Sequence, residues 1–344
     1  MRIAYIGPAH GTSLHRARAL ERLGHELTIV DPWSWLGASP WIDRWLWHTG
    51  GVGVGLAIDD GIFRRTTHVR PDLIWIDQGQ FLGRSLLQRL RRLGRPIINY
   101  TIDNPFSRVH RRRFRRYRQA VREVDLLAVV RESNVEEAHT AGARRVVRVW
   151  RSADEVAHRP RSLTRQQHQA YASDVTFVGT WMPERGPFLA RLVERGVALS
   201  IWGDRWHRAA EWHTLRPYWR GPALNDDDSY AAAIQSAKVC LGLVSARVGD
   251  LHTTRSMEIP ALGGLFCAQR TSEHLDLYEE GSEAQFWADA DECAAACRQL
   301  LADEPRRRQL AASGRARALR NRNYNQPVLA SLIETALTHS TVAS

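Results

Sequence analysis

The sequence of 344 residues lacks several features that would mark a membrane or secreted protein. It contains no apolar run of about 18 residues, the length that a transmembrane helix needs. It also lacks a basic segment followed by an apolar one at its start, the pattern of a secretory signal peptide. We therefore expect a cytoplasmic protein with no transmembrane segment.

Cysteine is also scarce, with four residues in the chain. Cys240 and Cys267 fall in predicted buried strands, whereas Cys293 and Cys297 are one helical turn apart with no second ligand pair nearby in sequence. Small apolar core residues are the favoured interpretation, ahead of a disulfide or metal site. The acidic run from Asn225 to Ser229 is the nearest thing to a carboxylate metal motif, but its place before an Ala-rich helix favours capping. We expect no metal site.

Apolar and charged residues make up 44% and 25% of the chain, ordinary fractions for a globular protein of about two domains. Strand and helix patterns alternate throughout, which predicts α/β domains with parallel sheets covered on both faces. The polar, weakly periodic stretch 153–172 is the expected linker. We expect a first Rossmann-like domain over 1–152, completed by a C-terminal helix within 322–344, and a second over 173–321.

The opening strand RIAYIG leads into a glycine turn and an amphipathic helix, as in the first unit of a Rossmann-like domain. Gly7 and Gly11 are present, but no third glycine completes the dinucleotide fingerprint. A nicotinamide dinucleotide site is therefore not expected at this turn.

Tryptophan is concentrated between Pro32 and Trp47, in the sequence PWSWLGASPWIDRWLW. Three interpretations compete: anchors of the hydrophobic core, a stacking platform for a sugar acceptor, and an interfacial belt beside neighbouring arginines. The core interpretation is the favoured one.

The excess of positive charge is confined to the first half of the chain. Residues 1–150 hold 25 arginines against 14 acidic residues, a net charge of +11, whereas residues 151–344 hold 23 of each. Much of the excess lies in RVHRRRFRRYR, from Arg108 to Arg118, where Phe114, Tyr117, Val121 and Val124 recur at helical spacing. A solvated helix and a helix that binds a polyanion, either an anionic lipid surface or a nucleic acid, are equally weighted interpretations.

The stretch LHTTRSMEIPALGGLF, from Leu251 to Phe266, follows an apolar strand over 239–244. Arg255 and Glu258 are three residues apart, which places them on one face of a helix. The predicted unit of strand, loop, helix and strand gathers charge at the carboxyl end of a parallel strand, where open α/β sheets bind ligands. An exposed surface ion pair is the alternative interpretation.

The run RSMEIPALGG, followed by TSEHLDLYEEGSEAQFWADADE, resembles the carboxyl-terminal domain of the CgeB-like (spore maturation protein) glycosyltransferases. These belong to the GT-B nucleotide-sugar transferases, which have two Rossmann-like domains facing a cleft and a C-terminal helix that crosses back to the first domain. The likeness covers roughly residues 174–320; the first half is similar only in its general pattern and in TIDNPF.

The resemblance implies a donor site in the second domain. Glu258 matches the glutamate that binds the ribose hydroxyls, and Arg255 and Arg185 are expected to clamp the diphosphate through their planar guanidinium groups. A UDP-sugar is the expected donor, with no tightly bound cofactor. The remaining expected donor-site residues are Gly179, Trp181, Gly203 and Tyr230.

Catalytic candidates follow from the same resemblance. His10 lies in a loop that faces the cleft, together with Gly7 and Gly11, which are expected to help bind the donor. Asp103 in TIDNPF could orient or deprotonate an acceptor hydroxyl. For Asp103 an Asx-type turn before Pro105 is the alternative, and for His10 a helix cap or a solvated side chain. Asp250 precedes Glu258 by the eight residues typical of retaining GT-B enzymes, although glutamate is usual at its position.

We therefore expect a retaining, metal-independent hexosyltransferase-like enzyme, with a cell-envelope or lipid-linked glycan as acceptor and peripheral attachment to the inner face of the membrane as one option. Three alternatives remain: a DNA-modifying glycosyltransferase acting on a hydroxylated base, a non-catalytic GT-B-fold protein that binds polyanions, and a nucleotide-sugar epimerase.

Overall fold

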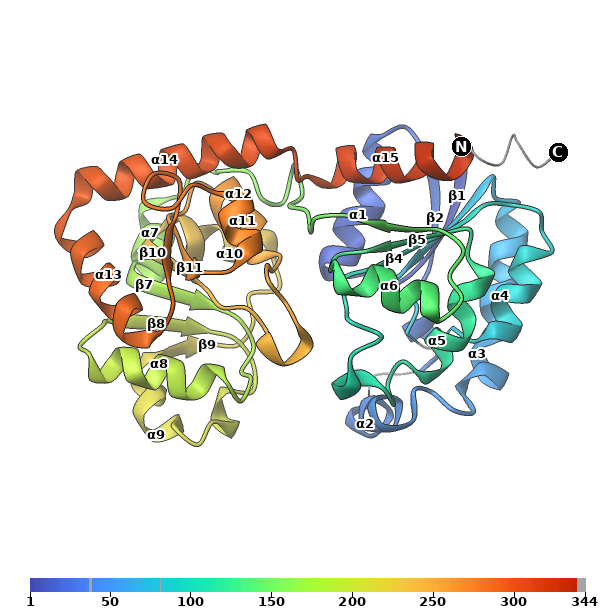
Figure 1. Ribbon diagram of the computed structural model, residues 1–344, viewed down its shortest axis with the longest axis horizontal. Coiled ribbons are helices and arrows are strands. Elements are labelled where there is room, and N and C mark those ends of the chain that lie inside the picture. Colours follow the sequence, from blue (N-terminus) through green and yellow to red (C-terminus); the bar gives the residue numbers. More distant parts are fainter. Residues whose placement is uncertain (37–38, 81, 339–344) are drawn as a thin grey trace. The chain divides into compact units, whose positions relative to one another are not determined.

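The computed structural model describes residues 1–36, 39–80 and 82–338, and the chain forms two compact units (Figure 1). The first unit comprises Met1–Arg151, Ala246–Gly249 and Tyr324–Ser344; the second comprises Ser152–Ser245 and Asp250–Asn323. Each unit is built on its own sheet.

The sheet of the first unit has six parallel strands in the order β2-β1-β3-β4-β5-β6. The central strands are apolar and buried on both faces, as the continuous Ile, Leu and Val runs predict. The strands are β1 (Arg2–Ile6), β2 (Glu26–Val30), β3 (Leu73–Asp77), β4 (Ile97–Thr101), β5 (Leu126–Val129) and β6 (Val146–Arg148).

Helices cover both faces of this sheet. On one face α1 (Gly11–Arg22) packs against α15 (Asn325–Thr338), so the C-terminal helix belongs to the first unit, as predicted. On the other face the core gathers under α3 (Val54–Val69), α4 (Arg84–Arg91) and α5 (Arg115–Ala120) (Figure 1). The remaining helices of this unit are α2 (Pro40–Thr49), α6 (Ser133–Thr140) and the 3₁₀ turns η1 (Pro32–Trp35), η2 (Arg108–His110), η3 (Val121–Glu123) and η6 (Ala246–Val248).

The sheet of the second unit also has six parallel strands, in the order β12-β11-β10-β7-β8-β9. Two parallel sheets with crossover helices confirm the predicted α/β fold. The strands are β7 (Ser173–Val178), β8 (Leu199–Trp202), β9 (Trp219–Gly221), β10 (Ala237–Gly242), β11 (Phe266–Gln269) and β12 (Gln285–Trp287).

The helices of the second unit begin inside the expected linker, where α7 (Arg165–Tyr171) starts with a capping box at Thr164. The side chain of Asp226 caps α10 by accepting a hydrogen bond from the backbone N–H of Ser229, at 2.7 Å, so the predicted capping role of the acidic run is confirmed. The helices are α8 (Arg185–Glu194), α9 (Trp212–Leu215), α10 (Asp227–Gln235), α11 (Arg255–Ala261), α12 (Ser272–Leu277), α13 (Ala290–Ala302), α14 (Glu304–Asn321), η4 (Trp206–Arg208) and η5 (Arg216–Tyr218).

Each sheet has one point where its strand order reverses. In the first unit the reversal falls between β1 and β3, and in the second between β10 and β7. The connections at such a point leave in opposite directions, which opens a crevice at the carboxyl ends of the two strands. These two strand pairs therefore mark where ligands are expected.

Two sequence expectations need correction. The core interpretation of the tryptophan-rich segment is wrong for four of its five indoles. Trp33 packs against the core. The other four are exposed, namely Trp35, Trp41, Trp45 and Trp47. The stretch 108–118 forms η2 and α5 instead of one continuous helix. Its predicted apolar face is nonetheless confirmed, since Phe114, Tyr117, Val121 and Val124 are all buried.

Across the part of the chain that the structure describes, every helix is too short or too polar to cross a bilayer.

Candidate functional site

A buried carboxylate lies at the centre of the polar cluster on α11. Glu258 is only 1% exposed, and its Oε2 accepts a hydrogen bond from the Tyr230 hydroxyl at 2.8 Å. Arg255 donates to the same oxygen, and Nε2 of His158 lies 3.4 Å from Oε1. The interpretation of Glu258 and Arg255 as an exposed surface pair is therefore wrong, because the carboxylate is inside the protein.

The surroundings keep this carboxylate charged. Burial alone would raise the pKa of Glu258, but the positive charge of Arg255, the nearby His158 and the Tyr230 hydrogen bond lower the pKa below its ordinary value. The guanidinium of Arg255 also donates through Nε to the backbone oxygen of Val178, at 3.1 Å, and lies over the Tyr230 ring. A carboxylate has about four acceptor positions. Three are directed at protein groups here, which leaves capacity for one further donor.

Arg185, at the start of α8, is a buried cation that forms no ion pair within 4.0 Å among the described residues, although the carboxylates of Glu184 and Asp250 act on it from farther away. The residue is 9% exposed. Its Nη1 donates to the backbone oxygen of Thr180 at 2.7 Å, its Nη2 lies 3.5 Å from Oγ of Ser245, and its Nε has no hydrogen-bond partner within the described chain. Burial lowers the pKa of Arg185 to about 10. Such a group favours an anion that could complete its hydrogen bonds.

Two glycines shape the backbone beside Arg185. Gly203 follows β8 with φ of 150°, and a Cβ there would lie 2.0 Å from the backbone oxygen of Gly179. A Cβ on Gly179 would lie 3.2 Å from Nη1 of Arg185. Side chains at either position would block the approach of the two strand ends, so both glycines are needed for the geometry around the guanidinium. Trp181 follows in the same loop, where its backbone N–H donates to the backbone oxygen of Asp204 at 2.9 Å.

Asp250 is buried in the second unit, where its backbone N–H donates to the backbone oxygen of Ser245 at 3.3 Å. The negative charges of Glu184 and, to a smaller extent, Asp250 act to raise the pKa of Arg185, although burial outweighs them. Seven of the eight predicted second-unit residues thus gather near the carboxyl ends of β7, β8 and β10 or on α11, and Tyr230 reaches the cluster from α10 through Glu258.

The first unit has a cavity of about 380 Å³ at its own reversal point, between the carboxyl ends of β1 and β3. Its walls include Gly7, His10, Trp33, Asp77, Gln80 and Arg113. His10 is the N-cap residue of α1, but its side chain is exposed and makes no capping hydrogen bond, which agrees with the solvated alternative. Gly7 is required because a Cβ there would lie 2.7 Å from Cβ of Asp77, whereas Gly11 (φ 57°) lies in open space at the start of α1.

Sequence reasoning missed a buried ion pair beneath this cavity. Both carboxylate oxygens of Asp77 accept from Arg16, from Nε at 2.6 Å and from Nη2 at 2.9 Å. Burial alone would lower the pKa of Arg16, but Asp77 raises it above its ordinary value. The available signal was an aspartate that ends the buried strand PDLIWID; its partner, 61 positions away, could not be found without the fold.

Asp103 reaches the cavity only indirectly. Its Oδ2 lies 3.1 Å from Nη2 of Arg113, whose Nε donates to Oε1 of Gln80 at 2.6 Å. The Asx-type turn is made by the neighbouring Asn104, which accepts from the backbone N–H groups of Phe106 and Ser107. The turn interpretation of Asp103 therefore applies to the adjacent Asn104, and the Asp103 side chain does not form the turn.

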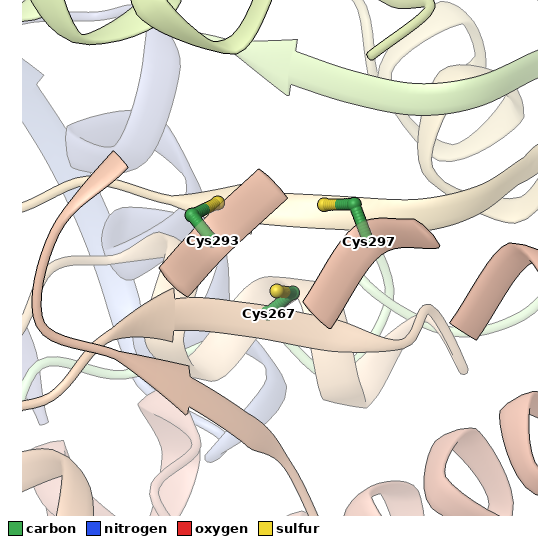
Figure 2. A group of neighbouring side chains, drawn as sticks. All are labelled: Cys267, Cys293 and Cys297. Carbon is green, nitrogen blue, oxygen red and sulfur yellow. The ribbon is translucent and has the colours of Figure 1, made fainter. Parts of the chain in front are cut away.

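The fold brings a third thiol to the predicted cysteine pair (Figure 2). Cys293 and Cys297 point from successive turns of α13 toward Cys267 on β11, and all three sulfur atoms lie within 4.8 Å of one another. All three residues are fully buried, and Cys267, Cys293 and Cys297 belong to the apolar core of the second unit. Burial in this core agrees with the predicted role as small apolar residues.

Comparison with known proteins adds to these observations. Residues 185–332 match the family described as glycosyl transferase-like. No functionally curated protein gives a significant match.

Solved structures are similar over nearly the whole chain. A sucrose-phosphate synthase from Thermosynechococcus elongatus aligns over 100% of both chains with a TM-score of 0.73 and 14% identity. The Anabaena protein Alr3699/HepE, solved in complex with UDP-glucose, aligns over 97% of this chain and 99% of its own, with a TM-score of 0.67 and 14% identity. A glycosyltransferase from Rickettsia africae ESF-5 aligns over 100% of this chain and 99% of its own, with a TM-score of 0.63 and 10% identity. The chain therefore has the GT-B fold of these solved structures, and its residues 185–332 are similar to a glycosyl transferase-like family.

Proposed function

We propose that this protein is a glycosyltransferase that transfers a sugar from a nucleoside-diphosphate sugar, held by the second unit, to an acceptor hydroxyl held by the first. The observation that carries the proposal is Arg185, buried at the reversal point of the second sheet without a carboxylate at ion-pair distance in the described chain. A diphosphate supplies the missing negative charge and accepts from the guanidinium in two places.

In the proposed donor complex Arg185 and Arg255 bind the diphosphate, and Glu258 accepts one ribose hydroxyl. Arg255 is one third exposed at its side chain, so it can turn toward a ligand while Tyr230 remains bonded to the carboxylate. UDP is the proposed nucleotide, in keeping with the UDP-glucose complex of the similar Anabaena protein. Two arginines neutralise the leaving diphosphate in this scheme, which makes the proposed reaction metal-independent.

The acceptor is proposed to enter the first-unit cavity, with its hydroxyl near His10. His10 is the exposed base of that wall, and Asp103 acts on the cavity through Arg113. Asp250 lies eight residues before Glu258 and close enough to influence Arg185, which supports the retaining course expected from that spacing. A cell-envelope or lipid-linked glycan is the proposed acceptor class, because its carrier would account for a positively charged first unit.

Isothermal titration against UDP, GDP, TDP and ADP tests the donor site. The proposal predicts binding of at least one nucleotide by the wild type and a large loss in Arg185→Met. No heat with any of the four would remove the donor-site assignment.

Stereochemistry is tested separately, by NMR of the first product formed from a matched donor and acceptor. Retention of the donor's anomeric configuration is expected. Inversion would remove Asp250 from the proposed mechanism and direct attention to a base in the first unit.

A further inference from the structure

The first unit carries an exposed apolar and basic surface whose residues line neither the proposed donor site nor the cavity proposed for the acceptor hydroxyl. We call it the Trp–Arg surface; it consists of exposed side chains on α2 and on the stretch that contains η2, namely Trp41, Arg44, Trp45, Trp47, Arg108, Val109, Arg111 and Arg112. Trp41 is 79% exposed, Trp47 47% and Trp45 39%. Large indoles placed in water are costly unless something covers them.

The helical spacing of α2 places Trp41 and Trp45 on a different side of the helix from the residues that pack on the core. Ile42 and Leu46, four residues apart, pack on the core, and Leu46 is 4% exposed. Trp41 and Trp45 are also four residues apart and therefore share a different stripe of the same helix. The helix thus has an apolar stripe toward the core and a second apolar stripe toward solvent.

The two parts of the surface are packed together. The rings of Trp47 and His110 meet edge to face with centroids 5.6 Å apart, and the guanidinium of Arg113 lies 4.8 Å from the Trp47 ring centre. Gly50, which ends α2 in a left-handed conformation, approaches the same stretch so closely that a Cβ would lie 2.5 Å from the backbone oxygen of Arg112. The exposed tryptophans and arginines therefore form one continuous patch.

The arginines of the stretch divide into two groups. Arg113, Arg116 and Arg118 turn inward, to the carboxylates of Asp103 and Asp59 and to backbone oxygens. The others face solvent: Arg108, Arg111, Arg112 and Arg115. The segments 39–53 and 107–118 together contain eight arginines and a single acidic residue, Asp43. Positive charge on this patch is therefore almost uncompensated by its own sequence.

We infer that the Trp–Arg surface docks on an anionic phospholipid bilayer, with the indoles at the level of the lipid headgroups and the arginines on the lipid phosphates. Tryptophan favours the interface because its ring is apolar while its N–H remains hydrogen-bonded to water or headgroups. Arginines beside it supply the second, electrostatic contribution that stable peripheral binding needs.

Charge complementarity selects this occupant over the alternatives. A platform on which a sugar stacks needs no positive charge, and we expect it in the cavity. The wall of the cavity contains Trp33 and not the exposed indoles of α2. Nucleic acid would use the arginines and could stack single-stranded bases on the indoles. It remains a competing outcome of the experiment below. The inference concerns attachment alone and stands whether or not the proposed donor binds.

The test is sedimentation of the full chain with sucrose-loaded vesicles of phosphatidylcholine alone and of phosphatidylcholine with phosphatidylglycerol, at about 50 mM and 500 mM salt. Two variants remove the two contributions: Trp41→Ser with Trp45→Ser, and Arg108→Glu with Arg111→Glu and Arg112→Glu. Two matched controls change exposed residues of α14 in the second unit: Leu319→Ser, and the triple Arg306→Glu, Arg308→Glu and Arg315→Glu.

Binding to the anionic vesicles is expected at low salt, weakened at high salt because the charges are screened. Each arginine near a charged bilayer contributes about fivefold in partitioning, so the triple charge reversal should lower binding by at least about 100-fold. The tryptophan variant should bind the anionic vesicles at least about tenfold more weakly than the wild type at both salt concentrations. The controls should bind as the wild type does, and circular dichroism of all variants should match.

The inference is overturned if the wild type does not bind anionic vesicles at low salt, or if it binds neutral and anionic vesicles equally well. It is also overturned if the α14 controls lose as much binding as the surface variants. Capture of single-stranded DNA without vesicle binding would assign the patch to nucleic acid instead.

Discussion

Replacing Arg185 with methionine should make the unliganded protein more stable and the nucleotide complex weaker. Burial lowers the pKa of Arg185 to about 10, whereas arginine in water titrates above about 12. At about 1.4 kcal/mol for each tenfold change in an equilibrium constant, the charged side chain is disfavoured in the fold by about 3 kcal/mol. Methionine removes this cost and keeps an apolar contact with the Phe177 ring, over which the guanidinium lies.

The loss of one hydrogen bond offsets part of that gain. The backbone oxygen of Thr180 accepts from Arg185 at 2.7 Å, and leaving it unpaired costs about 1 kcal/mol. A net stabilisation of about 1–2 kcal/mol should follow, measured by urea denaturation without nucleotide. In the same variant UDP should bind about 30–150-fold more weakly, because a paired guanidinium–phosphate contact of about 2–3 kcal/mol is gone.

The matched control is Arg191→Met, on the same helix. The Arg191 side chain is 42% exposed and ion-paired with Asp291, so its replacement should leave both stability and UDP affinity nearly unchanged. The reasoning is refuted if Arg185→Met loses more than about 1 kcal/mol of stability, or if its affinity for UDP equals that of the wild type.

Three further predictions follow from the second unit. Glu258→Gln should lower the unfolding free energy by about 3 kcal/mol in urea denaturation, because Arg255 loses its buried carboxylate; a change under about 1 kcal/mol would show that the pair is not structural. Burial lowers the pKa of His274 to about 4, so the folded protein keeps this imidazole neutral while the unfolded chain protonates it below about 6.5. Stability should therefore be complete above about pH 6.5 and fall by up to about 3 kcal/mol as the pH drops to about 4, and the fall should flatten in His274→Gln; an equal slope in both proteins would contradict this. Gly203→Ala should destabilise the second unit by more than about 3 kcal/mol in thermal unfolding, because its Cβ would meet the backbone oxygen of Gly179; near-wild-type stability would show that the strand ends can separate.

The fold could be predicted from sequence to a large extent because parallel strands buried on both faces read as uninterrupted apolar runs. The strands ending at Ile6, Asp77 and Gly242 were recognisable in this way, as was the final helix after residue 325. Strand order was not, since the reversal points of the sheets depend on long-range pairing. Their positions decide which of the polar residues following the strands face a common crevice.

The site was predictable in its residue types but not in its contacts. Periodicity placed Arg255 beside Glu258, yet burial of the carboxylate depends on His158 and Tyr230, which come from distant parts of the chain. The lack of a direct ion pair for Arg185 within the described chain is a property of the packed structure and has no local signature in the sequence. The core interpretation of the tryptophans was wrong for a related reason. Helical spacing identifies an apolar stripe but does not show whether the core or another surface covers it.

The central claim is that the second unit binds a nucleotide sugar for transfer. It is tested most directly by incubating the protein with radiolabelled UDP-sugars and a membrane extract, and measuring release of UDP. The account predicts release from at least one donor by the wild type and its near-complete loss in Arg185→Met at an unsaturating donor concentration. Tight UDP binding with no turnover of any donor, or equal turnover by the two proteins, would contradict it.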